Sequence, residues 1–591
     1  MIRPVTNICC VGAGYVGGPT AAIMAYQNPH LRVTVVDNNE QRIRRWNSEH
    51  LPIYEPGLGD IVRIARDGSR QFQFTNKPID QHQQSTSLGQ NFLQHDEQVT
   101  VPARSPNLFF STQVGECIRE ADIVLIAVNT PSRTKGVGAG SATNMSSFNG
   151  VARVVAQHAR PGAIIVEKST VPCMTSKSVK RILALYRPGI HFEILSNPEF
   201  LAAGSAMKDL MYPERVLIGS ELTPTGRLAS AALASVYAAW VPPSRIITVD
   251  IFSSELVKLV ANSMLAQRVS SINSVSALCE KVGADIDAVA SILGADSRIG
   301  DKFLKAGIGF GGSCFKKDLL GMIYLAETVH LPEVAEYWRQ VIVMNEFQRD
   351  RFVRRVVACF DNCLASLKIT LLGYAFKANT SDTRETPALG IIKMLLHEDP
   401  VEIAIFDPCC NPEVVKAEIK ALIQDEPALK EDGGPIVVYS DAYDACAGSD
   451  AVLITTDFDE FRSTPKEGEP TAESADPRPF PPHLHGPTET EILSLHKYLL
   501  SVPSSADKID DPLGRYLPEP ACESNCPDCG LIKTSGYSTA GNTDENRPKI
   551  PLDWQRIVVD MNPPKLLFDG KGIIDAEEMS ELGFQVERIG H

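Results

Sequence analysis

A cysteine follows a cluster of glycines in the stretch 305–318, which reads KAGIGFGGSCFKKD. Four glycines within positions 307–312 give a backbone that can adopt positive φ angles and approach a ligand closely. Two lysines follow Cys314, and positive charge with unpaired backbone N–H groups would lower the pKa of the thiol towards the thiolate, which attacks carbonyl carbon. We therefore predict a nucleophile at Cys314. The simpler interpretation is a turn before a helix, with Cys314 as a small buried apolar residue.

A second glycine-rich turn, GAGYVG, lies between the apolar run 7–11 and a helical stretch at 19–26. A further apolar run, 31–36, ends at Asp37, twenty residues beyond the last glycine of the turn. Strand, GxGxxG turn, helix, strand and acid together form the dinucleotide fingerprint, with the pyrophosphate on the helix N-terminus. Asp37 can accept hydrogen bonds from a ribose 2′-OH and would repel a 2′-phosphate, which favours NAD over NADP. The turn contributes Gly12, Gly14, Tyr15, Val16 and Gly17 to the expected site.

Further apolar runs at 107–112, 123–128, 163–168 and 192–196 alternate with helical stretches. Such runs are typical of a parallel sheet covered on both faces. Polar turns follow three of them, at 129–131, 168–172 and 197–204. Because ligands bind beyond the carboxyl ends of parallel strands, we expect these turns near the ligand. Each turn by itself could be an ordinary strand exit.

The stretch 253–282 contains neither glycine nor proline and keeps a helical period of apolar residues. A helix of this length extends on the order of 45 Å at 1.5 Å per residue, so it could bridge two lobes or form an oligomer interface. Lys258 and Asn262 lie four residues apart on one face of it. Most such polar pairs are solvated, and a pair aimed at one pocket is the rarer case.

A second α/β unit is predicted from the apolar runs 368–372, 403–407, 436–439, 451–455 and 565–569. Its glycine turn is a degenerate version of the fingerprint, which favours a nucleotide over a second dinucleotide. The predicted fold class is therefore α/β, with two Rossmann-like doubly wound domains joined by a long central helix.

Two stretches interrupt this pattern, at 77–107 and 462–550, and their polar, proline-rich composition predicts inserted surface loops, the first mobile and the second disordered. The second contains Cys522, Cys526 and Cys529, whose spacing could suit zinc, with His483, His485 or His496 as a distant fourth ligand, or an iron–sulfur cluster. A closed structural metal site usually shows two paired-ligand knuckles. We therefore predict no metal here.

Composition narrows the class of protein. A chain of 591 residues is too long for one core and predicts two or three domains. The net charge of −15 argues against nucleic acid or a membrane surface as the main partner. Fourteen scattered cysteines without even spacing, and no secretory leader or membrane span, favour a cytoplasmic protein.

Seven motifs give the chain a specific resemblance that covers everything except the two insertions. It resembles the UDP-glucose 6-dehydrogenases of the UDP-glucose/GDP-mannose dehydrogenase family. The motifs stand in family order: GAGYVG at 12–17, EKSTVP at 167–172, SNPEFL at 196–201, SSELVK at 253–258, GFGGSC at 309–314, GYAFK at 373–377 and DTR at 382–384.

The resemblance implies oxidation of the C6 alcohol of UDP-glucose to the carboxylate of UDP-glucuronate, with two NAD⁺ and one water. Cys314 takes the nucleophile position, since a thiolate turns an aldehyde into a tetrahedral adduct and then yields a hydrolysable thioester. Glu199 would assist the hydrolytic water. Thr170 and Asp318 match positions that hold and relay protons through water.

Lys258 and Asn262 match donors that stabilise oxygen charge developing at C6. The implied NAD site comprises Gly12, Gly14, Tyr15, Val16, Gly17, Asp37, Arg42, Thr130, Thr170 and Arg384. The implied UDP-sugar site comprises Glu199, Phe200, Leu201, Lys258, Asn262, Lys305, Gly309, Phe310, Gly311, Phe376, Lys377 and Lys571, with Arg298 reaching a neighbouring subunit's site.

The resemblance also implies a division into an NAD-binding domain at 1–218, a central helical dimerisation domain with the cysteine loop at 219–330, and a UDP-sugar-binding domain at 331–591. A homo-oligomer is expected, a dimer through the central helix and a hexamer by likeness to eukaryotic members. Two positions depart from the family pattern: Ala203 replaces a usual glutamate, and Lys571 replaces an arginine, so a bidentate contact to substrate is lost. Rival hypotheses are a sister enzyme acting on GDP-mannose or a UDP-N-acetylhexosamine, and a non-catalytic scaffold.

Overall fold

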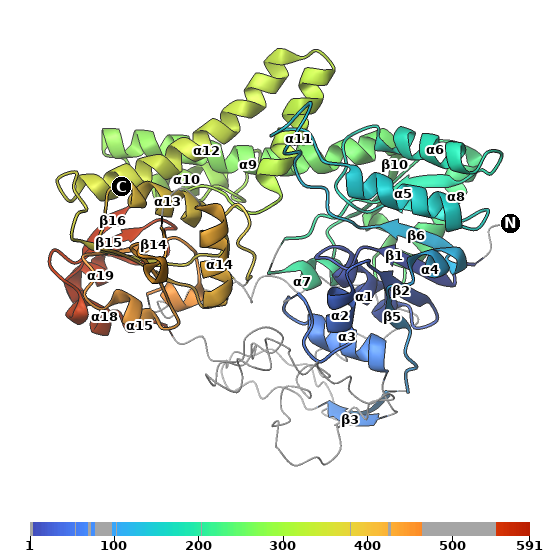
Figure 1. Ribbon diagram of the computed structural model, residues 1–591, viewed down its shortest axis with the longest axis horizontal. Helices are drawn as coiled ribbons and strands as arrows, with labels where there is room; N and C mark the ends of the chain where they lie inside the picture. The colour runs from blue at the N-terminus through green and yellow to red at the C-terminus, as the bar shows by residue number, and fades with distance from the viewer. Residues whose placement is uncertain are drawn as a thin grey trace, which may run out of the picture.

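The computed structural model describes residues 4–53, 55–68, 103–202, 204–378, 380–423, 427–463 and 551–591, together with the backbone of 72–76 and 97–101. Two α/β units lie side by side, and a layer of long helices runs across both of them (Figure 1). Ala203, most of each expected insertion and the cysteine and histidine cluster at 483–529 lie outside the described residues. No described helix is both long enough and apolar enough to cross a membrane.

The first unit is built on an eight-stranded sheet with the order β10-β9-β8-β7-β6-β1-β2-β5. Its strands are β1 (Asn7–Val11), β2 (Arg32–Val36), β5 (Leu108–Ser111), β6 (Ile123–Ile126), β7 (Ile164–Glu167), β8 (Glu193–Ser196), β9 (Val216–Ser220) and β10 (Ile246–Asp250). Strands β1, β2 and β5 to β8 are parallel, as predicted, whereas β9 pairs antiparallel with β8 and parallel with β10. The sheet therefore continues to Asp250, and the boundary expected at 218 lies inside β9.

Apolar cores cover both faces of this sheet. Along β1, Ile8 and Cys10 belong to one core, whereas Cys9 and Val11 belong to the other. This alternation explains why β1 is a continuous apolar run instead of an alternating one. The helices of the unit are α1 (Gly17–Gln27), α2 (Glu40–Trp46), α3 (Leu58–Asp67), α4 (Val114–Glu120), α5 (Ser146–His158), α6 (Thr175–Tyr186), α7 (Ala206–Met211) and α8 (Pro224–Tyr237).

The loop predicted over 77–107 contains ordered structure at its C-terminal end. β4 (Glu97–Val101) pairs antiparallel with β3 (Phe72–Asn76). Arg104 then donates hydrogen bonds to the backbone oxygens of Ala25 and Tyr26. Residues 97–101 of the expected insertion thus form a strand, which β-branched Val99, Thr100 and Val101 favour despite the polar surroundings.

The predicted long helix is α9 (Ile251–Val282), and it starts directly after β10 at the edge of the first sheet. The Asp250 side chain caps its N-terminus by accepting from the Ser253 amide at 3.0 Å, and Gly283 ends it in a left-handed conformation. α9 packs against α11 (Phe315–Thr328) and α12 (Pro332–Ala358), with α10 (Ile286–Ala295) beside it. These helices connect the two α/β units (Figure 1).

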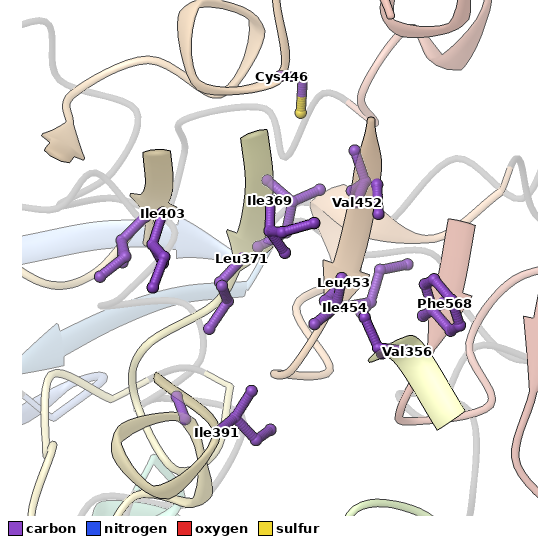
Figure 2. Close-up of a cluster of buried hydrophobic side chains, with 14 of the residues drawn as sticks. Val356, Ile369, Leu371, Ile391, Ile403, Cys446, Val452, Leu453, Ile454 and Phe568 are labelled. Carbon is purple, nitrogen blue, oxygen red and sulfur yellow. The ribbon is translucent and has the colours of Figure 1, made fainter. Parts of the chain in front are cut away.

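The second unit has a six-stranded, all-parallel sheet with the order β13-β12-β11-β14-β15-β16. Its strands are β11 (Lys368–Leu372), β12 (Glu402–Phe406), β13 (Ile436–Tyr439), β14 (Ala451–Ile454), β15 (Leu566–Asp569) and β16 (Gln585–Arg588), and its helices are α13 (Pro387–Leu396), α14 (Pro412–Leu422), α15 (Ala442–Cys446), α18 (Trp554–Asp560) and α19 (Ala576–Leu582). Figure 2 shows its core, with Cys446 of α15 and Ile391 of α13 on opposite sides of the central strands. Two Rossmann-like units joined by a long helix confirm the predicted fold class.

Candidate active site

A cleft of about 3490 Å³ is lined by both α/β units and by the glycine and cysteine loop between α10 and α11. One small-ligand site usually occupies about 300–1,000 Å³, so the cleft has room for a dinucleotide and a second ligand together. Most of the predicted site residues line it: Gly12, Gly14, Tyr15, Val16, Asp37, Arg42, Thr130, Thr170, Glu199, Phe200, Leu201, Asn262, Gly309, Phe310, Gly311, Cys314, Phe376, Lys377, Arg384 and Lys571.

Side chains of two long helices hold the glycine loop in place. Asn273 of α9 accepts from the Gly307 amide at 2.9 Å. Asn345 of α12 accepts from the Phe310 amide at 2.8 Å and donates to the Phe310 oxygen at 3.1 Å. Gly309 has a φ of 105°, and a Cβ there would lie 2.6 Å from Asn345 Oδ1, so the loop needs glycine for both conformation and space.

The end of the same loop packs against the second α/β unit. Gly312 has a φ of 84°, and a Cβ on it would lie 2.7 Å from the Phe376 ring. A Cβ on Gly311 would lie 2.6 Å from Pro387 Cδ. These glycines therefore lie close to protein atoms of the second unit. This packing fixes the position of Cys314, directly before α11.

Cys314 is exposed to the cleft, and four charged side chains act on its thiol. Although solvent reaches the sulfur, the surrounding protein removes much of its hydration, and this desolvation raises the thiol pKa. Glu199 and Asp318 raise it further, whereas Lys258 and Lys317 lower it. The predicted lowering of the Cys314 pKa is therefore wrong for this structure, because the two carboxylates and desolvation outweigh the lysines.

Lys258 and Glu199 form a buried ion pair next to the cysteine. The Lys258 Nζ atom lies 3.4 Å from Glu199 Oε2, and the two side chains are only 4% and 8% exposed. The Leu201 amide also donates to Glu199 Oε2, at 2.8 Å. Burial alone would raise the pKa of Glu199, but Lys258, this amide and Lys168 together lower it. Glu199 is thus a buried carboxylate held in its charged form.

Asn262 and Asp318 form the second buried pair. The Asn262 Nδ2 atom donates to Asp318 Oδ2 at 2.6 Å, which links α9 to α11. Lys317 Nζ lies 3.3 Å from the other Asp318 oxygen and donates to Thr130 Oγ1 at 3.5 Å. Thr130 donates to the backbone oxygen of Thr170 at 2.7 Å. Lys317 is one of the two lysines noted after Cys314, and its contacts connect the turns at 130 and 170 to Asp318.

The GxGxxG turn has the shape that a dinucleotide requires. Gly12 has a φ of 111°, and a Cβ on it would lie 2.4 Å from the backbone oxygen of Ala127. A Cβ on Gly17 would lie 1.9 Å from the oxygen of Gly12, so the turn and the start of α1 close on each other. Gly14 faces the cleft with no atom nearer than 3.9 Å to its Cβ position. This open position leaves room for a pyrophosphate beside the N-terminus of α1.

Asp37 and Arg384 both line this part of the cleft. Asp37 Oδ2 accepts from the Ala13 amide at 2.9 Å and pairs with Arg42 at 3.1 Å. Arg384 comes from the second unit, pairs with Asp382 at 2.6 Å and lies 5.3 Å from the centre of the Tyr15 ring. Residues of both units therefore meet over the glycine turn. These side chains fit NAD, and bound NAD would supply a hydride acceptor to the cleft.

Three predicted substrate residues do not line the cleft: Lys258, Lys305 and Arg298. Lys305 is exposed and lies near Lys571, and desolvation by the surrounding protein lowers the pKa of both lysines. Arg298 is exposed, with its side chain 86% accessible and paired to Asp296 at 2.6 Å. In a single chain Arg298 is therefore outside the site. Lys258 and Asp318 lie in the wall itself and contact the cleft residues Glu199 and Asn262.

A buried network around Lys168 was missed by the sequence analysis. The Lys168 Nζ atom donates to Asn197 Oδ1 and to the Tyr237 hydroxyl, at 3.1 and 3.3 Å. Lys168 and Asn197 stand in the EKSTVP and SNPEFL motifs, so the strand exits that contain them gave a signal. Tyr237 lies on α8, and no motif around it in the sequence indicated a place in this network.

Taken together, the site offers a sulfur nucleophile at Cys314, cationic and amide donors at Lys258 and Asn262, and carboxylates at Glu199 and Asp318. An amine and an amide can stabilise a developing oxygen anion, and a carboxylate can accept a proton. Such a set suits oxidation of an alcohol through a covalent intermediate on sulfur.

Family models match all three parts of the chain. The UDP-glucose/GDP-mannose dehydrogenase NAD binding domain matches 6–87 and 93–241, the central domain matches 252–347, and the UDP binding domain matches 370–476. The chain is 46% identical over 465 residues to UDP-glucose 6-dehydrogenase 2 of Oryza sativa subsp. japonica, an alignment covering 77% of this chain and 88% of the relative. It is 45% identical to UDP-glucose 6-dehydrogenase of Pongo abelii, with 78% and 85% covered.

Solved structures agree with this assignment. The chain is similar to a UDP-glucose dehydrogenase from the archaeon Pyrobaculum islandicum, with a TM-score of 0.61, 26% identity and coverage of 77% of this chain and 91% of the other. It also shares its fold with a UDP-D-ManNAc dehydrogenase from Pyrococcus horikoshii, at a TM-score of 0.62, 18% identity and coverage of 99% of both chains. The chain belongs to the UDP-glucose/GDP-mannose dehydrogenase family.

Proposed function

We propose that the chain is an NAD-dependent dehydrogenase that oxidises the C6 alcohol of UDP-glucose to the carboxylate through covalent adducts on Cys314. Relatives about 45% identical carry the name UDP-glucose 6-dehydrogenase, and the family includes an NAD binding domain and a UDP binding domain. The observation that carries the proposal is the position of Cys314. It stands at the start of α11, in the electrostatic field of the Lys258–Glu199 pair and of Asp318.

The first oxidation requires removal of the alcohol proton. Asp318, reached through a water held by Thr170, accepts this proton, while Lys258 and Asn262 stabilise the oxygen as charge develops on it. NAD held by the first unit would supply the acceptor for the hydride that leaves C6 in each of the two oxidations. The product of the first oxidation is an aldehyde.

The second oxidation uses the sulfur of Cys314. The thiol is neutral at rest because its pKa is raised, so its proton passes to the aldehyde oxygen as the sulfur bonds to the aldehyde carbon, which gives a thiohemiacetal. Loss of the second hydride from C6 and of the hydroxyl proton to water converts this thiohemiacetal into a thioester. Glu199 then takes a proton from water, the resulting hydroxide adds to the thioester carbon, and the carbon–sulfur bond breaks to release the carboxylate.

The two units divide the binding. We assign NAD to the first unit, through Gly12 to Gly17, Asp37, Arg42, Thr130 and Thr170, with Arg384 contributed by the second unit. We assign the nucleotide of the sugar substrate to Lys305, Gly309 to Gly311, Phe376, Lys377 and Lys571, and its sugar to Glu199 to Leu201, Lys258 and Asn262. Lys571 offers a point charge where the family resemblance implies a guanidinium, so binding of the diphosphate is expected to be weaker.

An assembly of several copies completes the proposal. Met264 and Leu278 on α9 are 55% and 64% exposed, which suits a dimer through this helix. Arg298, exposed in one chain, would reach the neighbouring subunit's site in a hexamer. The eleven cysteines within the described residues are free thiols, and this supports a location in the cytoplasm.

Counting NADH per sugar consumed tests the proposed function. Limiting UDP-glucose with excess NAD is expected to give two NADH per sugar and UDP-glucuronate as product. GDP-mannose and UDP-N-acetylglucosamine, incubated in parallel, are expected to give no more than a small fraction of that rate. Absence of turnover with UDP-glucose, or a higher kcat/KM for one of the other sugars, would overturn the substrate assignment.

A further inference from the structure

Lys168 is a buried lysine for which the chemistry above has no role. It follows β7 directly, is 4% exposed and lines the cleft. Its hydrogen bonds run to the Asn197 amide oxygen at 3.1 Å and the Tyr237 hydroxyl at 3.3 Å, and both partners are neutral. Burying an ammonium costs several kcal/mol unless other groups compensate it, so a lysine at this position calls for an explanation.

The strand register places Lys168 beside the turn that carries Glu199. Strands β7 and β8 are parallel neighbours with Glu167 opposite Ser196, and the backbone N–H of Asn197 donates to the backbone oxygen of Glu167 at 2.9 Å. Lys168 and Asn197 are therefore the first residues beyond two adjacent strands, at the same edge of the sheet. Glu199 follows Asn197 by two residues, so the ammonium is anchored to the turn on which this carboxylate stands.

The Asn197 side chain is held from three directions. Its Oδ1 atom accepts from Lys168 and, at 2.6 Å, from the Tyr237 hydroxyl. Its Nδ2 atom donates to the Leu217 oxygen of β9 at 2.8 Å. The hydrogen bonds with Lys168, Tyr237 and β9 thus fix one orientation of the Asn197 side-chain amide. They thereby also fix the position of the turn at 197–199.

Four groups face the Lys168 ammonium from the surrounding elements. They are Cys10 of β1, Tyr237 of α8, Glu199 after β8 and Lys258 of α9. Burial lowers the pKa of Lys168 to about 8, although Glu199 and Cys10 act to raise it. The same attraction acts on Glu199, whose pKa is lowered by Lys258 and also by Lys168. Glu199 therefore responds to two lysines, of which only Lys258 is in direct ion-pair contact.

We propose that Lys168 is a positioning residue for thioester hydrolysis in the reaction proposed above, on which this inference rests. Its ammonium fixes the Asn197–Glu199 turn and supplies a second positive charge that keeps Glu199 a carboxylate. Only the carboxylate can accept the proton of the hydrolytic water, so losing this charge slows release of the sugar from Cys314 more than the oxidations that precede it.

The test compares Lys168→Met with the wild-type full-length chain. We measure kcat, the KM values for UDP-glucose and NAD, the dependence of kcat on pH, and the mass of acid-quenched protein during turnover. The variant is expected to lose about tenfold in kcat near pH 7, with both KM values within about twofold of the wild type. The acidic limb of its kcat–pH profile is expected to lie about one pH unit higher. The protein is also expected to carry the sugar adduct in a larger fraction of molecules.

Two control variants separate charge from architecture. Tyr237→Phe removes a partner of the ammonium but keeps its charge, so the acidic limb is expected to stay in place. Lys180→Met removes an exposed lysine paired with Glu221 and is expected to match the wild type. Should Lys168→Met not fold, Lys168→Gln replaces it, because glutamine can still donate to Asn197 and carries no charge.

The outcomes distinguish this inference from the proposed function. If wild-type protein produces no UDP-glucuronate, the proposed function fails. If wild-type protein turns over, and the uncharged variant keeps the wild-type acidic limb and accumulates no adduct, the role of Lys168 is overturned, even if the variant melts at a lower temperature.

Discussion

Asn262 donates a hydrogen bond of 2.6 Å to Asp318, and this contact joins the long helix α9 to α11, the helix that begins directly after Cys314. The same carboxylate is 3.3 Å from Lys317. Asn262, 56 positions before Asp318 in the chain, and the adjacent Lys317 thus hold this carboxylate in place from two sides. The position of the proposed proton acceptor is therefore coupled to that of the Cys314 sulfur.

Asp318→Asn should abolish proton acceptance while leaving the shape of the site. General base catalysis contributes roughly 10²–10⁴-fold, so kcat should fall by about 10² or more, with a small change in KM for UDP-glucose. Steady-state kinetics measures this. A variant with kcat within a few-fold of the wild type would show that Asp318 is not the proton acceptor.

Lys258→Met should destabilise the chain because it leaves a buried carboxylate without its partner. Breaking a buried pair costs about 3–5 kcal/mol, whereas an exposed pair contributes about 0–1 kcal/mol. Chemical denaturation should therefore show a large loss for Lys258→Met and almost none for Lys180→Met. The double variant Lys258→Met with Glu199→Gln should recover part of the loss. If Lys258→Met and the double variant lose the same stability, the unpaired Glu199 carboxylate is not the cause of the loss.

The Cys314 thiol should react slowly with iodoacetamide at neutral pH. Its pKa is raised, so labelling of its peptide should reach half its maximal rate above pH 8.5, the ordinary value of about 8.5 for a free cysteine. Glu199→Gln removes a negative charge and should move this midpoint down, whereas Lys258→Met should move it up. Mass spectrometry of the Cys314 peptide in protein without ligands gives the readout. A wild-type midpoint below pH 8 would contradict the raised pKa.

Asp37→Ser should weaken the preference for NAD. The carboxylate is available to the ribose hydroxyls of NAD and would repel the 2′-phosphate of NADP. A hydrogen bond to a charged group contributes about 1.5–3 kcal/mol, so the ratio of kcat/KM for NAD over NADP should fall by about tenfold or more. The KM for UDP-glucose at saturating cofactor serves as the control. An unchanged ratio would exclude Asp37 from cofactor selection.

Met264→Glu, near the middle of α9, should disrupt the proposed dimer. Sedimentation should show a smaller species than the wild type, because a charge on an apolar interface is costly to bury. Leu228→Glu is the matched control, since Leu228 is 52% exposed and belongs to α8 instead of α9. An assembly unaffected by Met264→Glu would place the interface elsewhere.

Much of the fold and site follows from the sequence because parallel strands bring their ends together. The turns after β6, β7 and β8 could thus be placed at one edge, with Thr130, Thr170 and Glu199 on them. The opposite direction of β9 and β10 was missed, since no local sequence pattern sets the direction of these strands relative to β8. The pKa of Cys314 was also mispredicted, because desolvation by the surrounding protein raises it most and cannot be inferred from the adjacent residues. Glu199, the next contributor, lies 115 residues away in the chain.

The position of the covalent adduct tests the central claim most directly. Glu199→Gln protein, incubated with UDP-glucose and NAD and quenched in acid, is expected to gain the mass of the oxidised nucleotide sugar, and peptide mapping is expected to place this mass on Cys314. Cys314→Ala protein treated in the same way should form no adduct and no UDP-glucuronate. Formation of UDP-glucuronate by Cys314→Ala at the wild-type rate, or an adduct on any other residue, would contradict the account.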